Sequence, residues 1–156
     1  MMGVFPVLTS SHATGVGPVE EHAGEAFQFL ADDDGCIAMV HRERDRSVLA
    51  YVLPQVFVEV ELDWEERAAF LLVGEPADGG RPAGYYVDPQ GRKVRWHLTA
   101  ALDRSPDPEH RGMAKRLRQV TRRSGFDAMV AQVDVYADAI REVLPQLPAL
   151  VRELRS

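Results

Sequence analysis

The stretch of sequence that decides the fold is Val56-Phe57-Val58-Glu59-Val60-Glu61-Leu62-Asp63. Every second residue of this stretch is aliphatic, and the residues between them are acidic from position 59 onward. An alternation with a period of two is typical of a β-strand that has one buried and one exposed face. We therefore expect a strand here, with Glu59 and Glu61 on a solvated surface.

The residues that follow this strand allow two interpretations. Asp63 and Glu66 fit a capping box and Gly74 fits a helix end, which would make residues 63–74 helical. Alternatively, residues 67–73 form a strand that pairs back on the first one through a turn at 63–66. Periodicity alone does not separate the two for so short an apolar run, and we favour the strand.

Two further hairpins are predicted on either side of this pair. Upstream, residues 36–42 and 47–53 flank a charged connection at 43–46. Downstream, Asp88-Pro89-Gln90-Gly91 fits a type I turn that leads into residues 92–98. About five strands joined by short connections predict an antiparallel meander, because a parallel sheet needs crossover helices.

The final strand of this series has two chemically different faces. Its alternation places apolar residues on one side and basic residues on the other, with Val94, Trp96 and Leu98 opposed to Lys93, Arg95 and His97.

Helical patterns enclose the strands. Pro18 suits the first turn of an N-terminal helix, which we expect to end near residues 32–35, where Gly35 can take a left-handed turn. Behind the strands, Asp107 fits an N-cap and Pro108 the first helical position. Ser124 and Gly125 then separate this helix from a second one, and a short helix is expected over residues 147–154.

These patterns predict an α+β fold. It consists of an N-terminal helix, an antiparallel β-meander of about five strands, and two to three C-terminal helices packed on the sheet. A chain of 156 residues that is 46% hydrophobic can bury one core. We therefore expect a single α+β domain over residues 1–156, strand-rich over 36–102 and helical over 107–155.

The chain is acidic overall, with 24 acidic and 18 basic residues, but the segment from His110 to Arg123 contains no acidic residue. On the basic helix predicted over residues 108–123, Met113, Leu117 and Val120 share one side. Six basic residues, which we call the basic ridge, lie on the other side. Four form a narrow stripe and two flank it: Arg111, Lys115, Arg118 and Arg122, with Arg116 and Arg123 beside them.

The basic ridge is the predicted partner-binding site. The next helix carries acidic residues on its outer side, so the ridge either pairs with them as an ordinary solvated surface or binds an acidic protein partner. As a nucleic-acid surface it lacks aromatic residues for stacking, and Gln119 is its one side chain suited to base recognition. A pI near 5.3 also argues against a polyanion as partner.

No catalytic, metal-binding or cofactor motif stands out. The five histidines are scattered from position 12 to position 110 and lack the short spacing of a zinc site. We therefore expect no catalytic residue, no metal and no cofactor. An enzyme would need a pocket that brings His41 or His97 together with a carboxylate from another strand.

Composition suggests the compartment and the source. No apolar run of about 18 residues is present, so we expect no membrane span. The N-terminus lacks the basic and apolar regions of a secretory signal, and the single cysteine, Cys36, cannot form an internal disulfide. A cytoplasmic location fits both observations. Sixteen arginines against two lysines suggest a GC-rich bacterial genome.

The sequence thus favours a non-enzymatic bacterial interaction module, similar to an adaptor, chaperone or immunity protein, that binds a protein partner through a charged surface. Two alternatives stay open. One is a small nucleic-acid-associated protein that uses the basic helix over residues 108–123. The other is an enzyme whose site is assembled only by the fold.

Overall fold

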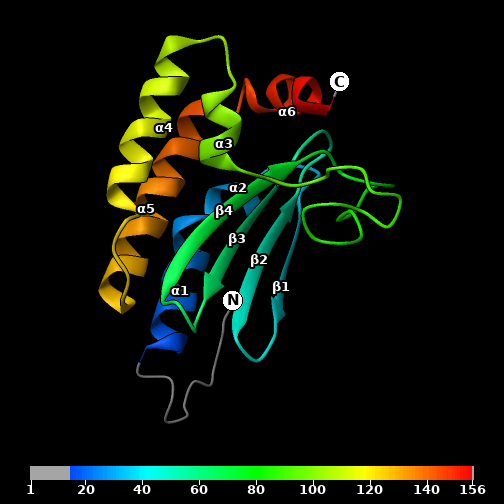
Figure 1. Ribbon diagram of the computed structural model, residues 1–156. Helices are drawn as coiled ribbons and strands as arrows, with labels where there is room; N and C mark the ends of the chain where they lie inside the picture. The colour runs from blue at the N-terminus through cyan, green and yellow to red at the C-terminus, as the bar shows by residue number, and fades with distance from the viewer. Residues whose placement is uncertain (1–14, 156) are drawn as a thin grey trace.

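The computed structural model describes residues 15–155, and the N-terminal segment considered above lies outside them. A five-stranded antiparallel sheet is covered on one face by helices, so the α+β class is confirmed (Figure 1). The strands follow one another in the meander order β1-β2-β3-β4-β5. Their bounds are β1 Ile37–Arg42, β2 Arg46–Val52, β3 Phe57–Asp63, β4 Ala68–Gly74 and β5 Trp96–His97.

Strand β3 lies at the centre of the sheet and has the expected alternation. Val58, Val60 and Leu62 point to the helices and belong to the hydrophobic core, whereas Glu59 and Glu61 lie on the opposite face, which we call the outer face. Residues 63–74 form a turn and strand β4, as favoured over the helix. The Asp63 carboxylate supports this turn by accepting a hydrogen bond from the Glu66 amide at 2.9 Å.

The last hairpin keeps its predicted turn but has shorter strands. The Gly91 amide donates to the Asp88 carbonyl at 2.9 Å, as in the expected turn. Only residues 96–97 then pair with β4, and the segment from Glu75 to Arg95 forms a long loop, which we call the outer loop. Residues 98–103, predicted to be part of the strand-rich region, instead form helix α3. The helical part of the chain therefore begins earlier than predicted.

The described chain contains six helices. The predicted N-terminal helix is divided at Phe27, and Gly35 follows it in the expected left-handed conformation, with φ of 83°. Behind the sheet, the boundaries at Asp107, Gly125 and residue 147 agree with the prediction. The bounds are α1 Val16–Ala26, α2 Gln28–Ala31, α3 Leu98–Asp103, α4 Pro108–Val120, α5 Phe126–Val143 and α6 Leu147–Arg155.

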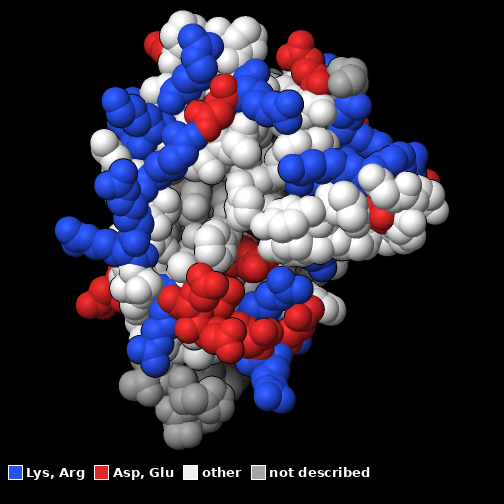
Figure 2. All heavy atoms as spheres, in the orientation of Figure 1, with Lys and Arg blue, Asp and Glu red and all other residues white. Residues whose placement is uncertain are grey.

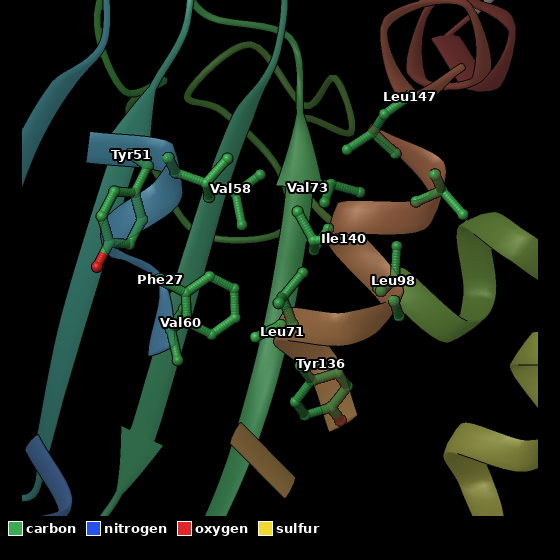
Figure 3. Close-up of a cluster of buried hydrophobic side chains, with 14 of the residues drawn as sticks. Phe27, Tyr51, Val58, Val60, Leu71, Val73, Leu98, Tyr136, Ile140 and Leu147 are labelled. Atoms are coloured by element: carbon green, nitrogen blue, oxygen red, sulfur yellow. The ribbon is translucent and has the colours of Figure 1, made fainter. Parts of the chain in front are cut away.

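The hydrophobic core fills the space between the sheet and the helices (Figure 3). Phe27 from the N-terminal helical segment meets Val60 of β3, and Ile140 of α5 faces Leu71 of β4. All four side chains are fully buried. Burial of each such side chain contributes roughly 1.5–3 kcal/mol to folding. None of the helices between residues 15 and 155 is both long enough and apolar enough to cross a membrane.

Candidate functional site

Helix α4 presents the basic ridge. Asp107 caps its first turn by accepting a hydrogen bond from the Glu109 amide at 2.9 Å, and Pro108 occupies the first turn. Met113, Ala114 and Leu117 anchor the helix in the core. Because these residues occupy one side of the helix, its basic residues lie on the opposite, solvated side.

All six residues of the basic ridge are exposed. Figure 2 shows lysine and arginine side chains gathered over the part of the molecule where α4 lies in Figure 1. The prediction of one helix over 108–123 is wrong at its C-terminal end, because α4 ends at Val120. Thr121 closes the helix through its amide and hydroxyl, which both donate to the Leu117 carbonyl. Arg122 and Arg123 therefore lie in the turn between α4 and α5.

Two of the ridge residues have intramolecular partners. Arg118 forms an ion pair with Asp103 at the end of α3, and Arg111 donates to the Ser105 carbonyl at 2.9 Å. Within residues 15–155 the other four side chains form no hydrogen bond or ion pair: Lys115, Arg116, Arg122 and Arg123. These four side chains therefore do not pair with the acidic side of α5, which was one of the two possibilities that the sequence left open.

A groove adjoins one of these unpaired cations, Arg123. It encloses about 550 Å³ between the end of α4 and the start of α5. Val120, which the sequence pattern placed on the apolar side of the helix, is exposed here instead. Ala128 and Ala131 supply further apolar surface, and Arg123 and Asp127 provide the charged part of the lining.

A second polar cluster lies on the outer face of the sheet and was not identified from the sequence. Glu59 accepts hydrogen bonds from Arg95, at 2.8 and 3.2 Å, and from Arg81, at 2.7 Å. Glu61 accepts from the Tyr85 hydroxyl at 2.7 Å. We call this set of five residues the β3 glutamate network.

The expectation that Glu59 and Glu61 form a solvated surface is wrong. The two residues are only 1% and 4% exposed, because the outer loop folds over them. The sequence contained a signal for this arrangement, since the predicted last strand carries Arg95 on a basic face that complements the acidic face of β3. Recognising it would have required knowing that the two segments meet across β4.

A cavity of about 290 Å³ adjoins the β3 glutamate network and is also lined by His41. This is the combination of a histidine with carboxylates from another strand that an enzyme would need. However, His41 lies 3.6 Å from Glu43 rather than in contact with the buried glutamates. Both buried carboxylates are also engaged by arginine or tyrosine, so the network acts first as a support for the outer loop.

The surroundings of two titratable side chains at this face, Tyr85 and His97, shift their pKa values. Burial, followed by the hydrogen bond to Glu61, raises the pKa of the Tyr85 phenol. Burial lowers the pKa of His97, and this outweighs the attraction of Glu61. His97 Nε2 lies 2.7 Å from the Tyr86 hydroxyl, which can donate to the neutral ring.

Comparison of the chain with protein-family models, with curated proteins and with solved structures gives no match. Among the described residues, no group of three or more histidine, cysteine, aspartate or glutamate side chains is placed to hold a metal ion. Within residues 15–155, the basic ridge with its adjoining groove, and the β3 glutamate network with its adjoining cavity, are two candidate sites.

Proposed function

We propose that this protein is a non-enzymatic binding module that holds an acidic segment of a partner protein against the basic ridge and the adjoining groove. The observation that carries the proposal is a set of four cations without intramolecular partners in residues 15–155, one of which, Arg123, lines a groove that also exposes the apolar Val120. Carboxylates of a partner would pair with Lys115, Arg116, Arg122 and Arg123. An apolar side chain next to them would cover Val120.

The charge distribution supports a protein partner over a nucleic acid. Outside the ridge the chain carries 24 acidic against 12 basic residues, which would repel a long polyanion. The ridge also has no aromatic residue on which a base could stack. A short acidic protein segment avoids both difficulties, because it contacts only the ridge and groove.

Capture of partners from a lysate of the source organism tests the proposal. Three immobilised proteins are compared: wild type, the ridge variant Lys115→Glu with Arg122→Glu, and the matched variant Lys93→Glu with Arg152→Glu. The two variants change the net charge equally, and only the first alters the ridge. We expect one acidic protein to bind wild type and the matched variant. Its affinity for the ridge variant should be at least about tenfold lower, and its binding to wild type should weaken as the salt concentration rises.

Two results would contradict the proposal. In the first, binding of every captured protein is equally weak for both charge variants, which would show a non-specific charge effect. In the second, the purified protein is retained on duplex DNA at about 150 mM salt and this retention is lost in the ridge variant. That outcome would favour the nucleic-acid alternative.

A further inference from the structure

The groove beside Arg123 is a seam between two helices. Helices α4 and α5 contact each other and run side by side in opposite directions, joined by a short turn (Figure 1). One wall of the groove is formed by Gln119 and Val120 on the last turn of α4. The other wall is formed by Asp127, Ala128 and Ala131 near the start of α5. A molecule in the groove would therefore contact a row of side chains from each helix.

The spacing along these rows fits a helix better than an extended strand. Val120 follows Arg116 by four residues on α4, and Ala131 follows Asp127 by four residues on α5, so each pair spans about one helical turn of roughly 5.4 Å. Side chains on one face of a partner helix repeat at that interval, whereas those of a strand repeat about every 6.6 Å. Because Ala128 and Ala131 are small, the axis of a third helix can approach α5 to the usual distance of about 8–10 Å.

The two sides of the groove carry charges of opposite sign. Arg123 lines it just after α4, and Asp127 lines it on α5. Arg116, one turn before Val120, adds an exposed cation to the α4 side. Among the described residues, none of these three charged side chains forms a hydrogen bond or an ion pair. A uniformly acidic segment in the groove would bring a carboxylate beside Asp127, and such a contact between like charges weakens binding.

We infer, on the basis of the function proposed above, that the segment held in the groove is an amphipathic α-helix of the partner whose two flanks differ in charge. Its apolar row covers Val120 and packs against Ala131. Its acidic flank faces α4 and pairs with Arg116 and Arg123, and its basic flank faces α5 and pairs with Asp127. Charges on the two flanks of a helix select its partner in the same way in coiled coils.

Three synthetic peptides of about 18 residues, long enough to form a helix, test this geometry by fluorescence anisotropy. The first has a leucine row at helical spacing, glutamate on one flank and lysine on the other. The second has glutamate on both flanks. The third contains the residues of the first in an order that leaves no apolar face. We expect the first peptide to bind wild type at least about tenfold more tightly than the third, although the two have the same net charge.

A charge reversal on α5 tests the assignment of the flanks. Asp127→Lys should weaken binding of the first peptide and strengthen binding of the second, so that the ratio of the two dissociation constants changes at least about tenfold. Asp34→Lys, at an exposed acidic residue in the turn before β1, alters the net charge equally and should change this ratio by less than about threefold. Equal changes in the two variants would overturn the assignment of the basic flank to α5.

Filling the groove tests whether the helix lies in it. Ala131→Trp should weaken binding of the first peptide about tenfold, whereas Ala100→Trp, the same change at an exposed alanine of α3, should leave it unchanged. Circular dichroism checks that both variants remain folded.

The ridge variant Lys115→Glu with Arg122→Glu separates this inference from the proposed function. If the first and third peptides bind wild type equally and the ridge variant loses both, the ridge binds acidic segments but the inferred helix is wrong. If the ridge variant binds every peptide as tightly as wild type does, the ridge is not the binding site and the proposed function also fails. Failure of the first peptide to bind wild type overturns the inferred helix alone, because capture from the lysate tests the ridge independently.

Discussion

At the scale of single residues, the position of the outer loop depends on Arg95. All five of its N–H groups have acceptors: the two oxygens of Glu59 and the carbonyls of Pro82, Gly84 and Tyr85. We predict that Arg95→Met lowers the free energy of unfolding by about 3–5 kcal/mol, since it leaves a buried carboxylate short of partners. Urea denaturation measures the loss.

A double variant separates the ion pair from simple loss of packing. Glu59→Leu combined with Arg95→Met removes both charges, so its cost should be clearly smaller than the sum of the two single costs. Arg152→Met, an exposed change on α6, should leave stability close to that of wild type. Strict additivity of the two buried changes would mean that Glu59 and Arg95 do not act as a pair.

A second residue-scale prediction concerns His97. Burial lowers its pKa in the folded protein, so the unfolded chain takes up the proton more readily. The stability from neutral His97 is therefore complete above the unfolded pKa of about 6.5, and it decreases as pH falls from there through the folded value. An NMR titration of the His97 ring should give a pKa below 6.5. A value above 6.5 would contradict the assigned environment.

Comparison with His97→Gln isolates this contribution from the titration of carboxylates. Between about pH 7.5 and pH 5, wild type should lose more stability than His97→Gln, because the variant has no proton to gain at this site. Equal losses would show that protonation of His97 is not linked to folding. The free energy of unfolding by urea at each pH is the quantity to compare.

At the scale of elements, α4 holds most of the basic ridge in place. The contribution of its N-cap, Asp107, to stability can be measured separately. Asp107→Ala removes the acceptor for the Glu109 amide and should cost about 1 kcal/mol of stability. Asp107→Asn retains a side-chain oxygen and should cost less. If the alanine variant were as stable as the asparagine variant, the cap would contribute nothing to the helix.

Local signals in the sequence were sufficient for most element boundaries. The alternation around Glu59, the turn at Asp88 and the cap at Asp107 depend on residues close together in the chain, and all three are confirmed. The burial of Glu59 and the exposure of Val120 depend on segments that meet only after folding, so short-range patterns could not reveal them.

In the candidate site, too, features set by neighbouring residues could be predicted, whereas features set by tertiary contacts could not. The sequence identified all six basic residues of the ridge and their solvent exposure, because a helix periodicity separates them from Leu117 and its neighbours. It did not place Arg122 and Arg123 in a turn, since the end of α4 is determined by Thr121. The groove beside them requires the packing angle of α4 on α5, which no local pattern encodes.

At the scale of the whole molecule, one hydrophobic cluster links the parts of the chain that the sequence divided into a strand-rich and a helical region. It joins Val19 of α1, Val58 of β3, Ile140 of α5 and Val151 of α6. If the sheet or the later helices unfolded alone, the apolar surface that they share would therefore be exposed to water. Folding of the two regions should be coupled.

We predict a single cooperative unfolding transition in urea. Circular dichroism at 222 nm reports mainly the helices, whereas tryptophan fluorescence reports the sheet through buried Trp96 on β5 and half-buried Trp64 in the turn before β4. Measured at one protein concentration, the two signals should have the same midpoint. Two separate midpoints would mean that the helices unfold independently of the sheet. In that case the shared core would be too weak to join residues 36–102 to residues 107–155.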